Sequence, residues 1–236
     1  MSSLYPRPMP HPLFCAIGAA LLAVSPALHA QTRHDEQIWV NLTAMGSIKG
    51  DIVYFAEVQP RMGDGASRLD QLIMRGAIGV KLSPALTLYQ GYGHIAVPLE
   101  GRRDVNEERS FQQINWTLGK ALGGEFSTRT RIEQRWRSDG DDMGWRLRAM
   151  IRYEAPLRRD GKGPNALLHS ESFVAFNDTD WGARAGFDQI RNFAGLEIPV
   201  GGASTIEAGY LNQYVNQAAG RSRMNHVASL ALFFRH

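Results

Sequence analysis

The sequence predicts an all-β fold, namely a single closed antiparallel up-and-down transmembrane β-barrel of about 10–12 strands that follows a cleaved signal peptide. Polar and apolar residues alternate with period two along most of the chain after residue 31, and no stretch there keeps a helical apolar period for three turns. The alternating segments run about 10–14 residues, whereas strands of soluble proteins average about five or six and a membrane-crossing strand needs about 9–11. Tight turns and longer polar connections follow one another in alternation, which is typical of a barrel with one short-turn rim and one long-loop rim.

The first 30 residues have the pattern of a secretory signal peptide. Arg7 supplies a positive charge, residues 13–24 are apolar, and residues 25–30 resemble a cleavage region. The apolar run is too short to span a bilayer. We therefore expect a signal peptide over 1–30 and one outer-membrane barrel domain over 31–236. Cys15, the single cysteine, lies in the segment to be removed, so we expect neither a disulfide nor a cysteine nucleophile in the mature chain.

The expected strands are recognised by apolar residues at every second position, bounded by glycine, proline or polar turns. In chain order they are 36–45, 52–61, 69–82, 86–97, 109–118, 126–137, 145–154, 167–176, 189–198, 205–215 and 225–235. This gives eleven by eye. An odd number cannot close an antiparallel barrel without one parallel pair, so we expect ten or twelve, with 36–45 short of a full wall strand or two strands merged into one.

Two hairpins of this series resemble each other. Residues 79–92 and residues 195–210 each read as a strand, a tight turn and a strand that ends in Gly-Tyr. The separation between them is far longer than a solenoid repeat, so they are interpreted as two similar hairpins of one sheet.

The most informative stretch is 126–137, in which charged residues occupy every second position from Arg129 to Arg137. Ile132 and Trp136 lie between them. In a strand this pattern makes one face a ladder of charge and the other face largely apolar. The next expected strand repeats it with Arg146, Arg148 and further charges.

Alternation alone does not decide which face points inward, because a soluble calyx and a membrane barrel are opposites in this respect. Aromatic residues near the ends of the apolar faces favour the membrane barrel, since such rings form girdles at the two borders of the lipid. We therefore expect a lumen lined by charge. The residues expected to face it are Arg75, Arg109, Arg129, Arg131, Glu133, Arg135, Arg137, Arg146, Arg148, Arg152, Glu154, Glu171, Arg191, Glu197 and Glu207.

These arginines have three interpretations. They form a structural ion-pair network on a lumen wall, they select small anionic solutes, or they are a solvent-facing ladder on a soluble protein. The first is favoured, because like charges in register on an outer wall gain nothing, whereas in a lumen they can pair with glutamates across the barrel.

The mature chain also resembles a family of bacterial proteins known as domain of unknown function 2490. The resemblance rests on Trp39, on Glu-Arg-x-Phe-Gln-Gln at 108–113, on Arg-Ile-Glu-Gln-Arg at 131–135, on Phe-Asp-Gln-Ile-Arg at 187–191 and on Glu-Ala-Gly-Tyr at 207–210. It implies a small outer-membrane β-barrel and carries over neither a reaction nor a ligand.

Only one segment brings histidine, hydroxyl and carboxylate together, at 169–172. His169 and Glu171 are expected on one face, with Ser170 and Ser172 on the other, which is poor geometry for a nucleophile and its base. The aspartates of 138–144 suit a solvated turn better than a calcium loop. Gly91-Tyr92-Gly93 lacks the lysine and the helix of a phosphate loop.

The sequence therefore predicts a non-enzymatic protein of a Gram-negative outer membrane, with no cofactor and no metal. Its expected partners are outer-membrane lipid and small anionic solutes. Nucleic acid is not expected, because charges of both signs are interspersed and the net charge is only +3. A periplasmic lipid-binding calyx and an outer-membrane lipid hydrolase remain the alternatives.

Overall fold

The computed structural model describes residues 32–217 and 222–236, and the predicted signal peptide lies outside them. The described chain is all-β. Its strands are β1 (Thr32–Lys49), β2 (Ile52–Gly63), β3 (Arg68–Ser83), β4 (Leu86–Val97), β5 (Val105–Ala121), β6 (Gly124–Arg137), β7 (Gly144–Pro156), β8 (Asn165–Ala175), β9 (Gly186–Gly201), β10 (Ser204–Asn216) and β11 (Ser222–Arg235). None of the described residues belongs to a helix long and apolar enough to cross a membrane.

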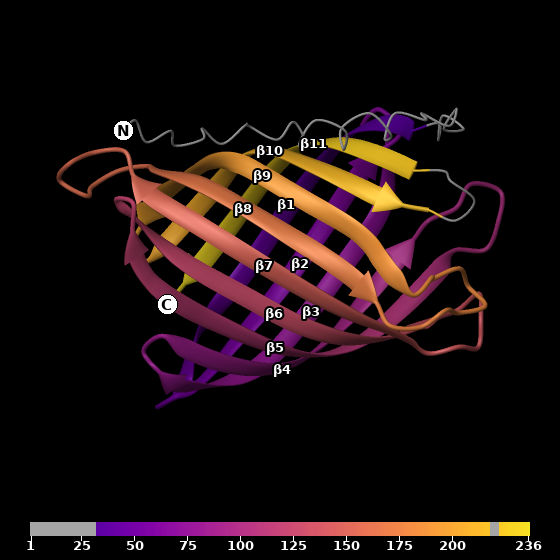
Figure 1. Cartoon of the computed structure of the whole chain (residues 1–236), viewed down its shortest axis with the longest axis horizontal. Helices are drawn as coiled ribbons and strands as arrows, with labels where there is room; N and C mark the ends of the chain where they lie inside the picture. Colours follow the sequence, from indigo (N-terminus) through magenta and orange to yellow (C-terminus); the bar gives the residue numbers. More distant parts are fainter. Residues whose placement is uncertain (1–31, 218–221) are drawn as a thin grey trace, which may run out of the picture. The chain divides into compact units, whose positions relative to one another are not determined.

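The strands close into one barrel in which each pairs with its neighbours in sequence, so the up-and-down topology is confirmed (Figure 1). Ten neighbouring pairs are antiparallel, whereas β1 and β11 pair in parallel from Thr32↔Ser222 to Met45↔Arg235. The count of eleven is within the predicted range, but the expectation of an even number was wrong. An odd number of strands closes the barrel with one parallel pair, because β1 and β11 both run from the long-loop rim to the short-turn rim.

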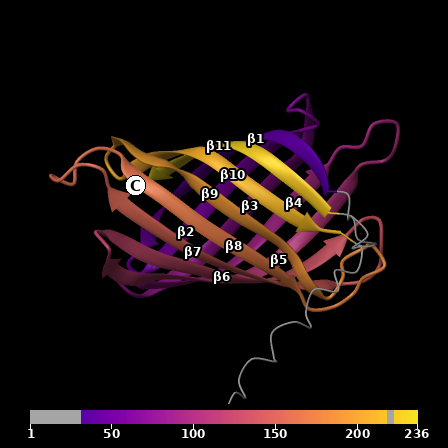
Figure 2. The same ribbon diagram turned by 45° about the horizontal axis from the view of Figure 1, so that its top comes forward.

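The first strand also differs from expectation. It extends over 18 residues and is hydrogen-bonded on both sides, so it is a full wall strand. The short turns after β1, β3, β5 and β9 lie at one rim together with His236, and the longer loops after β4, β6 and β8 gather at the other (Figures 1 and 2). The connection 157–164 is longer than its companions at the short-turn rim.

The outer faces of the strands are largely apolar. Ile38, Leu42, Val58, Ile151 and Leu230 are all exposed on them. The predicted girdle residues lie on the same outer surface at its two borders. Trp136, Trp145, Phe176 and Tyr214 are near the long-loop rim, and Tyr153 and Phe234 are near the short-turn rim. Soluble monomers rarely expose contiguous apolar patches larger than a few hundred square ångströms.

One region of the outer surface departs from this pattern. Across β4, β5 and β6, Gln134 donates to Gln112 over 3.0 Å and Gln112 donates to Gln90 over 2.8 Å. Nearby, the carboxylate of Glu108 accepts a hydrogen bond from the Tyr92 hydroxyl at 2.8 Å and contacts His94 Nδ1 at 2.6 Å. These side chains satisfy one another within the wall, which lowers the cost of placing polar groups in an apolar surrounding.

Candidate functional site: an arginine-lined barrel interior

The charged faces of the strands point into the barrel, and every residue expected to face the lumen lies on its interior side. Arg131, Glu133, Arg135, Arg146, Arg148, Glu171, Glu197 and Glu207 are buried, and Arg75, Arg109, Arg129, Arg137, Arg152, Glu154 and Arg191 are intermediate. Ile132 and Trp136 belong to the opposite, outer face. The interior therefore holds the guanidinium groups, as the membrane-barrel interpretation requires.

Glu133 of β6 is the centre of the network and is 0% exposed. Arg146 donates to its Oε2 from Nε at 3.0 Å and from Nη2 at 2.6 Å, and Arg148 donates to its Oε1 at 2.9 Å. Arg131 Nη1 lies 3.6 Å from Oε1. Strand register explains this convergence, because Glu133 is directly opposite Arg146 and Arg131 is opposite Arg148 on β7. The alternating sequence thus becomes a lattice of opposite charges.

Two further sets of ion pairs lie beside this centre. Arg148 also forks onto Glu171 of β8, with contacts of 2.9 and 3.1 Å. Towards the long-loop rim, Glu107 accepts from Arg109 at 2.7 Å and from Arg135 at 2.5 Å. Hydrogen-bonded pairs of this kind tolerate burial, whereas an isolated ion does not.

A separate cluster lies towards the short-turn rim. There Arg152 contacts Glu154 at 3.0 Å, Glu197 at 2.7 Å and Glu207 at 2.6 Å. One guanidinium thus links strands β7, β9 and β10. Arg152 has five N–H donors in a rigid fork, which suits a position between several carboxylates.

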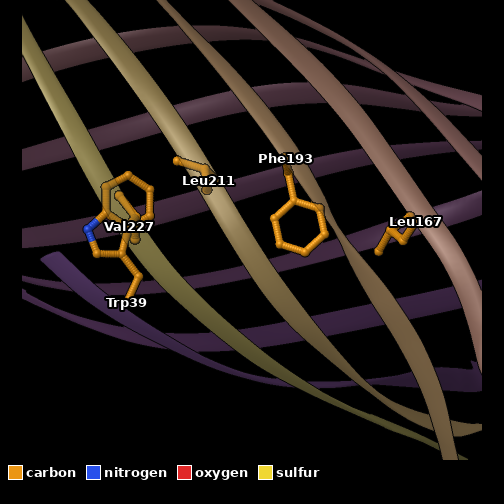
Figure 3. Close-up of a cluster of buried hydrophobic side chains, with 5 residues drawn as sticks. All are labelled: Trp39, Leu167, Phe193, Leu211 and Val227. Atoms are coloured by element: carbon orange, nitrogen blue, oxygen red, sulfur yellow. The ribbon is translucent and has the colours of Figure 1, made fainter. Parts of the chain in front are cut away.

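Apolar side chains fill much of the remaining interior. One buried cluster lies on the wall formed by β1 and β8–β11, and it consists of Trp39, Leu167, Phe193, Leu211 and Val227 (Figure 3). A second cluster on β2–β5 consists of Val53, Phe55, Ala77, Tyr89 and Phe111.

These clusters and the ion pairs leave no room for water around several residues of the middle. Phe111, Leu167 and Glu133 are 0% exposed. The walls of a water-filled pore would be accessible to solvent. The middle of the barrel is therefore closely packed around these residues, as is expected when a barrel is narrow enough to be filled by its own side chains.

Above the packed middle, a cavity of about 560 Å³ lies at the long-loop rim. Its lining includes interior residues of most strands and residues 181–185 of the loop after β8. A volume of this size is within the range of small-molecule pockets, which is about 300–1,000 Å³. We call this space the arginine chamber, after the ten arginines that line it: Arg61, Arg75, Arg109, Arg135, Arg137, Arg146, Arg148, Arg184, Arg191 and Arg223.

Two loops are clasped together at the rim of the chamber. Asp180 accepts hydrogen bonds from the backbone N–H groups of Asp141 at 2.8 Å and Asp142 at 3.2 Å, and its own N–H donates to the Asp142 carboxylate at 2.8 Å. These donors, led by the Asp141 N–H, lower the pKa of Asp180 from its ordinary value of 3.8. Trp181 is anchored by a 2.7 Å bond from its indole N–H to the Asp142 carbonyl and lies under Arg135 and Arg137.

The other candidate sites do not assemble. His169 stacks on Phe193 inside the barrel at 4.8 Å, whereas Ser170 lies on the outer face and bonds to Asn192 at 2.8 Å. A serine and a histidine on opposite faces of the wall cannot exchange a proton directly. Among the described residues, no three histidine, cysteine, aspartate or glutamate side chains are grouped as metal ligands. Asp141 and Asp142 serve the loop clasp instead.

The matches to known proteins extend over most of the barrel. A family model described as "Protein of unknown function (DUF2490)" matches residues 36–225, which run from β1 into β11. An uncharacterized protein of Methylorubrum extorquens is 50% identical over 218 residues, covering 92% of this chain and 94% of its own length. No solved structure matches the chain significantly. The chain belongs to the DUF2490 family of proteins of unknown function.

Proposed function

We propose that this chain is a non-enzymatic β-barrel protein of the bacterial outer membrane, exported by its N-terminal signal peptide. One observation carries the proposal: the outer surface of the barrel is a girdled apolar band, while the guanidinium and carboxylate groups are inside. In lipid, a closed barrel leaves no unpaired strand edge, and an apolar exterior is what acyl chains favour.

The interior is a binding chamber rather than an open pore. The packed middle supports this part of the proposal, because ion pairs and aromatic rings occupy the interior there. Access is then from the long-loop rim alone. In a planar bilayer we expect no steady conductance, and a stable ohmic pore would overturn the chamber in favour of a channel.

The membrane location is tested with tryptophan fluorescence. One variant keeps only Trp116, which is 51% exposed on the outer face of β5, and its matched control keeps only Trp39, which is 3% exposed inside the barrel. All other tryptophans are replaced by phenylalanine. In vesicles that contain brominated phospholipid, the outer tryptophan should be strongly quenched and the inner one should not.

Cell fractionation and migration on gels complete the test. The protein should co-purify with the outer membrane and should change its migration on heating, as compact β-barrels do. A protein that is soluble without detergent, or a Trp39 quenched as strongly as Trp116, would overturn the proposal. Quenching of Trp39 by a bound apolar ligand, with Trp116 shielded from lipid, would instead support a periplasmic calyx.

A further inference from the structure

The charges of the arginine chamber do not balance. Its lining holds ten arginines but only three carboxylates, Asp70, Glu107 and Asp188. Each of these three already contacts an arginine: Asp70 contacts Arg68, Glu107 contacts Arg109 and Arg135, and Asp188 contacts Arg146. The chamber therefore has no carboxylate to spare.

Seven of the ten arginines are paired, within or just outside the lining. Their carboxylate partners are Glu57 for Arg75, Glu107 for Arg109 and Arg135, Asp139 for Arg137, Glu133 for Arg146 and Arg148, and Asp178 for Arg184. Within residues 32–217 and 222–236, the other three, Arg61, Arg191 and Arg223, have no carboxylate within 4.0 Å. Residues 1–31 and 218–221 contain no aspartate or glutamate that could neutralise them.

Arg61 is held rigidly and is only 8% exposed. Its Nη1 donates to Gln71 at 3.2 Å and its Nη2 donates to Gln59 at 2.9 Å. Its Cζ lies 3.7 Å from the centroid of the Trp39 ring. Its buried Nε has no hydrogen-bond partner among the described residues.

Arg191 is of intermediate exposure and lies opposite Glu171 in the register of β8 and β9, and it stacks on the same ring. Its Cζ lies 5.0 Å from the Trp39 centroid and 4.7 Å from the Phe173 centroid, and its buried Nε is likewise without a partner in the described part of the chain. Trp39 thus orients two guanidinium groups, and is itself fixed by a 2.8 Å bond from its indole N–H to Gln37.

The free Nε–H is informative because the Nε and Nη edge of arginine is one that binds carboxylate or phosphate oxygens in pairs. Arg61 and Arg191 both line the cavity of 560 Å³ and are both held by stacking on Trp39, so their guanidinium groups together form a prepared site for an anion. Without an anion, the buried charge of Arg61 has no carboxylate partner, which is costly.

We propose that the arginine chamber binds a free polyvalent oxyanion, a small solute bearing phosphate or carboxylate groups, through Arg61 and Arg191, with Arg223 adding a third unpaired charge. This binding rests on the proposed function only for the direction of entry, which is from the long-loop rim.

The test is isothermal titration of the refolded, detergent-solubilised barrel with sodium pyrophosphate and, separately, with citrate, at constant ionic strength set by sodium chloride. Wild type should bind at least one of them saturably. Arg61→Gln and Arg191→Gln should each weaken binding by about tenfold to a hundredfold, as expected for a lost charged hydrogen bond. Arg61→Lys keeps the charge but loses the planar fork, so it should also bind more weakly than wild type.

The matched control is Arg158→Gln. It removes the same charge from an arginine that is exposed in the 157–164 loop at the opposite rim, and it should bind like wild type. Heat-modifiable migration identifies the variants that have folded. Folded Arg61→Gln and Arg191→Gln proteins that bind like wild type, or a wild type that binds neither probe above the chloride background, would overturn the inference.

A lipid headgroup is the other source of such an anion. Phosphatidylglycerol added to the micelles should leave the pyrophosphate or citrate isotherm unchanged, and competition by this lipid would overturn the assignment to a free solute. Failure of the membrane proposal can be distinguished from failure of the anion-binding proposal, because cell fractionation does not depend on these arginines. A folded barrel that binds the probe but is absent from the outer membrane would refute the proposed function and keep the chamber.

Discussion

The packed interior is tested most directly at Glu133. Replacing it by glutamine keeps the shape of the side chain but removes the negative charge that Arg146 and Arg148 share through three hydrogen bonds of 2.6 to 3.0 Å. Arg131, at 3.6 Å, loses its nearest carboxylate as well. The amide also brings its own N–H donors against guanidinium donors.

The expected magnitude depends on whether water reaches this site. Breaking a buried ion pair by removing one partner costs about 3–5 kcal/mol, whereas a solvated pair contributes only about 0.2–1 kcal/mol. Since Glu133 is 0% exposed, we expect the larger loss in the free energy of unfolding of Glu133→Gln. Urea titration in phospholipid vesicles, followed by tryptophan fluorescence, measures it.

The control is Glu125→Gln, on the same strand but exposed near the short turn, which should change the free energy of unfolding by less than about 0.5 kcal/mol. A double variant, Glu133→Gln with Arg146→Gln, should lose less than the sum of the two single variants, because it removes both charges of one pair. A loss below about 1 kcal/mol in Glu133→Gln would refute the reasoning, since it would mean that the interior is filled with water.

Three further predictions test other parts of the structure. Gly91→Ala should lower the free energy of unfolding by about 1–3 kcal/mol, because a Cβ at this interior position would overlap the ring of Phe111. Leu230→Arg, in the middle of the apolar face of β11, should cost about 2–4 kcal/mol in vesicles, which urea titration measures. Acidification should loosen the loop clasp: the lowered pKa of Asp180 means that its contribution is present above its ordinary value of 3.8 and is lost as the pH falls through the lower folded value, which limited proteolysis of the loops can follow.

Each of these has its own check. Gly76→Ala, on the outer face of β3, has only one atom within 4 Å of the added Cβ, at 3.9 Å, and should be tolerated. Leu122→Arg, 88% exposed in a short turn, should cost little, and equal losses at positions 122 and 230 would argue against a lipid-facing wall. Asp180→Asn should loosen the loops at neutral pH, and an unchanged cleavage pattern in that variant would contradict the clasp.

Much of this architecture could be predicted from the alternation of polar and apolar residues at every second position alone. The stretch 126–137 puts guanidinium groups on one side and Ile132 and Trp136 on the other, and the structure keeps that division from Arg131 to Trp136. Strand direction could be predicted too, because tight turns and longer loops alternate. Closure could not: the pairing of β1 with β11 joins segments about 190 residues apart, and no local pattern encodes a parallel seam.

The side chains that fill the interior could not be predicted from the sequence either, although one sequence pattern indicated where they lie. The repeated hairpins 79–92 and 195–210 carry glycines that the structure uses as space for rings. A Cβ added at Gly195 or Gly209 would lie 2.7 or 2.8 Å from Cζ of Phe193, and Gly91 is similarly covered by Phe111. A glycine inside a strand marks a close approach, so the repeat encoded where aromatic side chains close the barrel.

The arginines serve two purposes that follow from a single imbalance. Glu133 is opposite Arg146 in register, and this pair is satisfied and stiffens the wall. Arg191 is opposite Glu171 in register, but that carboxylate contacts Arg129 and Arg148, and Arg191 stacks on Trp39 together with Arg61. A stacked guanidinium keeps its full charge and its planar edge. The same interior is therefore self-neutralised where it must be rigid and electropositive where it is open, so an anion can enter the chamber without breaking any pair that holds the barrel together.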